Sequence, residues 1–308
     1  MTRLYGGTIG NAFGGSNTLG NIKGSATLVI DEEGEGGDPE CPLILGEAYG
    51  GANKAYMDGA SILDLKCISG MPTIYGGSKQ ADINSDIVLT ITSGKYGQVF
   101  GGNNLGGRIN GSITVNIEET GCHPIIIGEL YGCGNEAPYT TPPGKTDPTV
   151  NVVSFTKIGK VFGGGYGSTA KVTGNPIVNI NMIPGDYAKG IDADENGTAD
   201  DNANQLGVIG EVYGGGNAAK VDGNTTVNIG TEEDVVLQSL LNDERSNVTE
   251  ATKTVQGANI KAVASFIPYS TVLDAAGNPK SYSGTGNVYG GGNQADVTGK
   301  TNVVIGRE

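Results

Sequence analysis

One acidic segment carries side chains whose types and spacing could bind a metal ion. Carboxylate or amide oxygens stand at alternate positions on Asp192, Asp194 and Asn196, glycine follows at the sixth position, and Asp200 stands at the ninth. Thr198 would contribute its backbone carbonyl. Hard cations such as Ca²⁺ take roughly six to eight oxygen ligands, and alternate residues of a tight loop converge on one point. The segment therefore predicts a calcium site.

The match to a calcium loop is incomplete at its end. Position 12 is Ala203, where a bidentate glutamate normally stands. Asp201 could replace that ligand in a shorter loop of the same type. The alternative interpretation is an acidic loop that is solvated and binds nothing.

The residues give weak support for nucleophilic or redox catalysis. A Ser-His-Asp or Cys-His arrangement would have to use His123, the one histidine, which lies in a turn before an expected strand. The cysteines form no CxxC pair, which argues against zinc and thioredoxin-like chemistry. We interpret Cys41, Cys67, Cys122 and Cys133 as scattered small buried residues or as carrying a disulfide.

The elements that must position any site repeat one short unit. Glycine supplies 54 of the 308 residues, far above the usual share of roughly 7 per cent, and without the Gly-X-Y period of collagen. Each unit has an aromatic residue, a glycine run, a polar turn, a second anchor residue and an alternating strand. The aromatic and second anchors are Phe13 and Gly24, Tyr49 and Gly59, Tyr75 and Ser85, Phe100 and Gly111, Phe162 and Gly174, Tyr213 and Gly223, and Tyr289 and Gly299. An eighth unit surrounds Tyr131.

Apolar residues occupy fixed places around the second anchor. Two residues before it stand Ile22, Met57, Ile83, Ile109, Val172, Val221 and Val297. Four residues after it stand Leu28, Leu63, Leu89, Val115, Val178, Val227 and Val303, and an aliphatic residue recurs two places later. A period of two indicates a β-strand with one buried face.

These units predict an all-β fold, a parallel β-helix of about eight coils. Near-identical units bury apolar side chains by stacking on their neighbours, and glycine, Asn and Asp between the short strands suit tight turns. Another β-solenoid or β-roll is the first alternative, and a β-sandwich or propeller is the second. We expect one solenoid domain over 1–308, a piece of a longer chain, with insertions at 31–42, 137–148, 184–206 and 231–284.

The outward positions of the strands after the second anchor are mostly Thr, Asn and aliphatic residues, with Asp64 as the one charged member. Polysaccharide lyases and glycosidases built on β-helices use clustered acidic and basic side chains on one strand face. That pattern is missing from these positions, so we expect no enzyme activity. A Thr/Asn face could instead bind a protein or glycan ligand.

The overall charge limits the partners. A net charge of −14 argues against nucleic acid and against an anionic membrane surface, because both need a cationic patch. The chain also has no apolar run of about 18 residues or more, so we expect no direct membrane insertion. Self-association through the ends of the solenoid stays open.

The units at 212–229 and 286–306 resemble the Gly/Asn/Thr repeats of large bacterial cell-surface proteins. The broad class is the adhesin-like β-helix of haemagglutinin and autotransporter passenger domains. The resemblance covers most of the chain and implies an extracellular or cell-surface location, and it identifies no catalytic residue. We therefore expect a non-enzymatic structural or adhesive repeat region. The alternatives are a carbohydrate-active or carbohydrate-binding β-helix and a calcium-stabilised surface module.

Overall fold

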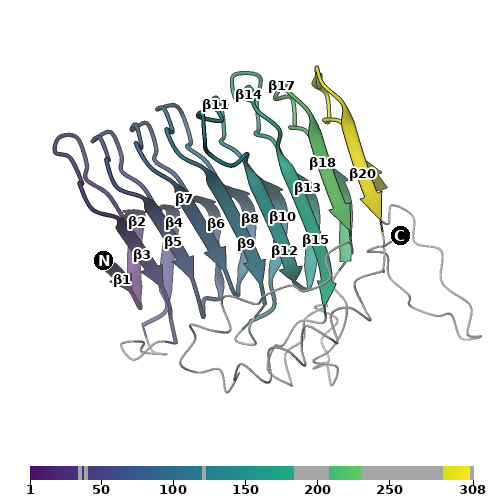
Figure 1. The fold of residues 1–308 in the computed structure, drawn as a ribbon. Coiled ribbons are helices and arrows are strands. Elements are labelled where there is room, and N and C mark those ends of the chain that lie inside the picture. Colours follow the sequence, from purple (N-terminus) through teal and green to yellow (C-terminus); the bar gives the residue numbers. More distant parts are fainter. Residues whose placement is uncertain (34–36, 38–40, 120–122, 184–207, 230–286, 306–308) are drawn as a thin grey trace, which may run out of the picture.

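The computed structural model describes residues 1–33, 37, 41–119, 123–183, 208–229 and 287–305, and this part of the chain is all-β. Its strands form two large parallel sheets and one small one (Figure 1). The predicted class, a parallel β-helix, is confirmed. We number the coils 1 to 8 by their aromatic residues, which are Phe13, Tyr49, Tyr75, Phe100, Tyr131, Phe162, Tyr213 and Tyr289.

Each coil contributes one strand to each large sheet. The nine-stranded sheet contains, in order, β1 (Thr2–Leu4), β3 (Ala26–Ile30), β5 (Ser61–Leu65), β7 (Ile87–Ile91), β9 (Ile113–Glu118), β12 (Thr149–Ser154), β15 (Ile177–Ile183), β18 (Thr225–Ile229) and β20 (Thr301–Ile305). The eight-stranded sheet contains β2 (Gly7–Phe13), β4 (Leu43–Tyr49), β6 (Gly70–Tyr75), β8 (Lys95–Phe100), β10 (Ile126–Tyr131), β13 (Lys157–Phe162), β16 (Val208–Tyr213) and β19 (Asn287–Tyr289).

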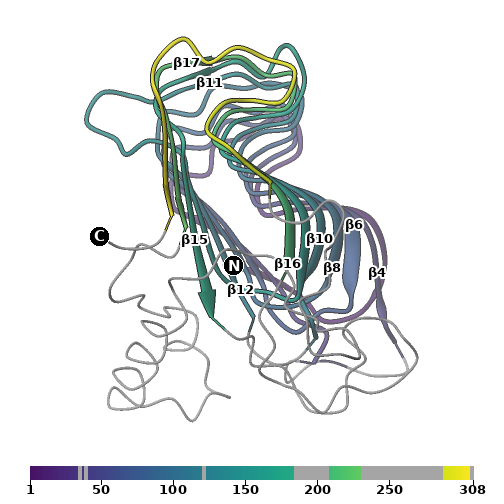
Figure 2. The ribbon, with the colours of Figure 1, turned by 90° about the vertical axis from the view of Figure 1, so that its right-hand side faces the viewer.

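A smaller lobe closes each coil between the two sheets (Figure 2). In coils 5 to 7 it carries β11 (Tyr139–Thr140), β14 (Val172–Thr173) and β17 (Val221–Asp222), which pair in parallel. In coils 1 to 4 single parallel bridges take the place of strands and join Ile22, Met57, Ile83 and Ile109. These residues are the apolar positions predicted two places before the second anchor, and we call this side of the molecule the third face.

The main core lies between the two large sheets. The expected inward file is present, because strand pairing aligns Leu28, Leu63, Leu89, Val115, Val150, Val178, Val227 and Val303. All of them are fully buried except Val303, which lies on the last strand of the sheet and is 39% exposed. A second apolar cluster fills the lobe and includes Met57, Ile83, Val172 and Val221.

The first glycine after each aromatic is required by the spacing of the coils. A Cβ on Gly101 would lie within 3.0 Å of the carbonyl oxygen of Gly132 in the next coil, and one on Gly132 would meet Gly163 in the same way. The relation repeats from coil to coil. A side chain at this corner would therefore force neighbouring coils apart.

Most long connections join the end of a strand of the nine-stranded sheet to the start of a strand of the eight-stranded sheet. The predicted insertion 31–42 joins β3 to β4 in this way, and the segments 184–207 and 230–286 connect the same two sheets. The structure differs from the prediction at 137–148, because Ala137 is buried and Tyr139 begins β11. The excursion from coil 5 therefore begins after Thr140.

Candidate functional site

The predicted calcium ligands cannot be placed. Asp192, Asp194, Asn196, Thr198 and Asp200 all lie outside the described residues. Within the part that the structure describes, no group of three or more His, Cys, Asp or Glu side chains could hold a metal ion. The calcium site therefore stays a prediction.

The histidine and the cysteines occupy separate places. His123 Nε2 lies 3.2 Å from Glu33 Oε1, a contact on the molecular surface between two connections. Cys67 is buried and disulfide-bonded. Cys41 is free and exposed, and Cys133 is free and fully buried, where burial raises the pKa of its thiol and suppresses the reactive thiolate.

The outward face of the nine-stranded sheet carries a ladder of amides. Asn151 donates to Asn116 at 3.0 Å, Asn179 donates to Asn151 at 3.0 Å, and Asn228 donates to Asn179 at 2.9 Å. Stacked amides of this kind stabilise sheets of in-register parallel strands. The Asn part of the predicted Thr/Asn face thus has a structural use, since its polar groups bond along the stack.

The eight-stranded sheet carries an outward charged row that the sequence analysis missed. Its members stand two residues before the aromatic and include the charged Glu47, Glu129, Lys160 and Glu211 together with the neutral Thr73 and Gln98. Lys160 lies 3.3 Å from Glu211, and Gln98 donates to Glu129 at 2.9 Å. The sequence signal is a Gly-polar-apolar-aromatic tetrad before every glycine run except that of coil 3, where Pro72 replaces the glycine.

The aromatic residues form one continuous stack beside this row. Neighbouring rings are 4.7 to 5.1 Å apart and nearly parallel. The hydroxyls of Tyr49 and Tyr131 donate to Glu47 and Glu129 on their own strands, both at 2.9 Å. Most of these rings are buried, so the stack is part of the core and leaves little ring surface for a ligand.

The third face is interrupted between coils 4 and 5. Among the described residues, parallel bridges run from Ile22 to Ile109 and begin again at β11, and none joins Ile109 to Tyr139. Tyr139 takes the place of the aliphatic residue of other coils. Its ring is buried and its hydroxyl donates to the carbonyl of Gly111 at 2.8 Å. We call this interruption the seam.

The lobe also changes conformation at the seam. In coils 5, 7 and 8 the fifth residue after the aromatic has a positive φ, which is 50° at Glu136, 56° at Ala218 and 61° at Gln294. These are the positive-φ non-glycine residues of the described part of the chain. Backbone bridges then link Asn135, Tyr166, Asn217 and Asn293, which coils 1 to 4 do not form in this part. The seam therefore joins two kinds of coil.

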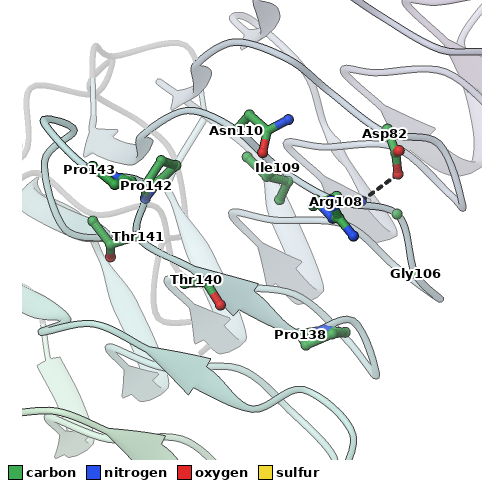
Figure 3. A pocket seen from close by; sticks show the side chains of 11 residues that line it. Asp82, Gly106, Arg108, Ile109, Asn110, Pro138, Thr140, Thr141, Pro142 and Pro143 are labelled. Carbon is green, nitrogen blue, oxygen red and sulfur yellow. Dashed lines mark hydrogen bonds between the residues drawn. The ribbon is translucent and has the colours of Figure 1, made fainter.

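A surface groove of about 690 Å³ opens at the seam. Figure 3 shows Arg108, Ile109 and Asn110 on one side and Pro138, Thr140 and the two prolines of the excursion on the other. Ligand sites in proteins commonly have roughly 300 to 1,000 Å³ and mix apolar walls with a few polar groups. The seam groove, lined by Asp82, Gly106, Gly107, Arg108, Ile109, Asn110, Pro138, Thr140, Thr141, Pro142 and Pro143, fits that description.

The excursion of coil 5 forms one wall of the seam groove. It projects from the lobe (Figure 2) and is tied back to earlier coils. Lys145 Nζ lies 2.9 Å from Asp86 Oδ1, and the Thr146 hydroxyl donates to Ser112 Oγ at 2.8 Å. Burial raises the pKa of Asp86, but hydrogen bonds from Lys145 and Ser112 outweigh it, and the pKa is lowered overall. The tie is therefore charged at neutral pH.

Arg108 supplies a cation to the seam groove. Its backbone N–H donates to Asp82 Oδ1 at 2.7 Å, which fixes the turn (Figure 3). The residue is exposed, and within the described part its guanidinium has no hydrogen-bond or ion-pair partner. The groove thus presents an unpaired guanidinium on a strongly acidic protein.

No family model, no curated protein and no solved structure matches the chain. No helix within the described ranges is long and apolar enough to cross a bilayer.

Proposed function

We propose that the chain is a non-enzymatic structural and adhesive repeat region of an extracellular bacterial surface protein. The observation that carries the proposal is the seam. On each side of the seam the coils repeat their own set of contacts, whereas between coils 4 and 5 the third face opens into a groove with a hydrogen-bonded wall and an unpaired cation. Binding residues commonly lie on loops that a rigid scaffold holds in position.

The surface polar groups support binding in preference to catalysis. The amides of the nine-stranded sheet bond to one another, and most of the charged row of the eight-stranded sheet is paired within itself or with tyrosines. A catalytic acid or base needs a pKa near the working pH and a free hydrogen-bonding position within reach of the substrate. Groups fixed in ladders stabilise the scaffold instead.

The cell-surface part of the proposal rests on two points. Cys67 is disulfide-bonded, and disulfides persist in oxidising compartments outside the cytoplasm. The repeats also resemble those of bacterial surface proteins. Protease treatment of intact producing cells should release peptides of this chain, and retention of all of it in the cytosolic fraction would contradict the location.

Adhesion is tested by applying the labelled full chain to immobilised extracellular-matrix proteins, mucin and a glycan array. We expect saturable binding to one ligand class, with no chemical change in the ligand. Depolymerisation of a polysaccharide by the pure chain would favour the enzymatic alternative.

The charged row favours a second candidate, a carbohydrate-binding or carbohydrate-active face. Glu129 and Glu211 lie on either side of Lys160 in register along the sheet, and acidic and basic side chains on one strand face are what such sites use. Glu129→Gln and Glu211→Gln should abolish glycan binding or cleavage if this face is the site. Unchanged glycan binding in both variants would reject it.

Calcium stabilisation is the third candidate and concerns the acidic insertion. If Asp192 and Asp194 bind Ca²⁺, added calcium should raise the melting temperature, because a ligand that binds only the folded state stabilises it. Asp192→Ala combined with Asp194→Ala should remove the increase, and Mg²⁺ is the control ion. Equal melting temperatures with and without calcium would exclude the site.

A further inference from the structure

The seam groove leaves two backbone edges facing each other. In coils 1 to 3 the bridging residue bonds to the next coil through its own N–H and C=O, as when Met57 N donates to Asp82 O at 3.0 Å and Asn84 N donates to Met57 O at 2.7 Å. Ile83 repeats both bonds with coil 4, each at 2.8 Å. Ile109 makes neither in the described part of the chain.

The opposite edge of the seam groove is also open. Tyr139 N donates forward to Lys171 O at 2.9 Å, and Thr141 N donates forward to Thr173 O at 2.9 Å. Because successive N–H groups of a strand alternate in direction, the N–H of Thr140 faces back toward coil 4. One edge therefore offers the N–H and C=O of Ile109, and the other offers the N–H of Thr140.

We propose that the seam groove binds an extended acidic peptide, which adds as a strand along these edges and places a carboxylate on Arg108. Strand addition to an open edge gains affinity from backbone hydrogen bonds and specificity from side-chain contacts. A guanidinium binds a carboxylate through two parallel hydrogen bonds. The inference rests on the proposed adhesive function and names its ligand.

The lining favours a peptide over a glycan. Pro138, Pro142 and Pro143 provide apolar walls for side chains, and none of the lining residues is aromatic, so the rings on which sugars usually stack are missing. Asp82 is the one acidic residue of the lining, and its Oδ1 accepts from the backbone N–H of Arg108. The guanidinium is therefore available to a carboxylate of the ligand.

A display library of short random peptides tests the proposal on the full chain. We expect enriched peptides to contain Asp or Glu within an extended segment. Arg108→Gln should weaken binding of a selected peptide about tenfold or more, because the two charge-assisted hydrogen bonds to the carboxylate are lost. Arg108→Lys should recover part of the loss, and Lys54→Gln, an exposed charge removal in coil 2, should have no effect.

A second pair of variants tests the backbone edge. Thr140→Pro removes the N–H that faces the groove, and Thr140→Val keeps it while removing the hydroxyl. We expect loss of peptide binding only in the proline variant, with the near-ultraviolet spectrum of the aromatic stack unchanged as the folding control.

Several outcomes would overturn the proposal. Enrichment of peptides without acidic residues, or binding that both Arg108→Gln and Thr140→Pro leave intact, would remove the seam groove as the peptide site. Binding of oligogalacturonate but of no peptide, lost in Arg108→Gln, would assign the groove to an acidic glycan. In each case adhesion of the full chain to matrix proteins, mucin or the glycan array reports separately on the broader function.

Discussion

At the scale of single residues, glycine sets how closely the coils approach. Gly128 and Gly10 hold the same place in the repeat, in coils 5 and 1. A Cβ on Gly128 would meet the carbonyl oxygen of Gly97 within 3.0 Å, whereas a Cβ on Gly10 would meet nothing within 4 Å. Gly128→Ala should lower the free energy of unfolding by about 1 to 3 kcal/mol, the usual range for overpacking, and Gly10→Ala should be nearly neutral. Equal urea midpoints for the two variants would contradict this reading.

Tyrosine ionisation should limit stability at high pH. Burial is the main reason that the pKa values of Tyr75 and Tyr213 are raised to about 12, and Glu47 and Glu211 add to the shift in Tyr75 and Tyr213 respectively. An unfolded tyrosine ionises near pH 10, so above that pH the unfolded state binds fewer protons than the folded state. Stability should therefore fall from about pH 10 through about pH 12.

Thermal melts between neutral pH and pH 12 check this expectation, together with tyrosinate absorbance of the folded chain. Tyr213→Phe keeps the ring in the stack and removes the ionisable group, so the alkaline loss should become smaller. A folded chain in which every tyrosine titrates near pH 10 would refute the expected shifts.

Single residues also show what the sequence could and could not predict. The inward file was predictable because a period of two and an aliphatic side chain are both local properties, as at Leu63 and Val178. The unpaired guanidinium of Arg108 was not, because pairing depends on which side chains the fold brings near it. Glu129 was overlooked for a simpler reason, since its strand precedes the aromatic from which the repeat was aligned.

At the scale of elements, the stability lost on removing one amide from the ladder of the nine-stranded sheet should depend on the position of that amide. Asn151 donates to Asn116 and accepts from Asn179, whereas Asn228 donates to Asn179 and has Val304 beside it in the next strand. With about 1 kcal/mol for each hydrogen bond, Asn151→Ala should cost about 2 kcal/mol and Asn228→Ala about 1 kcal/mol. Chemical denaturation of both variants measures the ratio, and a larger cost at Asn228 would rule out a ladder.

The third face shows that a strand pattern in the sequence predicts buried positions but does not predict where the pairing between coils is interrupted. Its apolar positions were expected from the sequence, and the bridges at Met57 and Ile83 confirm them. The seam was not expected. Tyr139 lies in a segment that the sequence pattern assigns to an insertion, and its buried ring and its hydrogen bond to Gly111 accompany the loss of pairing. That information exists only once the neighbouring coil is in place.

At the scale of the whole molecule, the last coil should be less protected than the middle. Tyr289 and Val303 are 44% and 39% exposed, whereas Leu89 and Val115 are fully buried. Among the described residues coil 8 pairs with coil 7 alone, and a repeat with one neighbour is less stable than a repeat with two. Hydrogen exchange in β20 should therefore be faster than in β7 and β9. Equal protection throughout would indicate that an additional surface covers the last coil.

The asparagines of the lobe reach past the adjacent coil, and this has a consequence for how the molecule assembles. Asn104 of coil 4 donates to the Tyr49 hydroxyl of coil 2 at 2.7 Å, and Asn217 of coil 7 donates to Tyr131 of coil 5 at 3.1 Å. The tyrosine hydroxyl of such a coil therefore receives its asparagine hydrogen bond only when the second coil after it has formed. The smallest folding nucleus should span three coils. The chain should therefore unfold more cooperatively than a repeat protein in which each repeat contacts only its adjacent repeats.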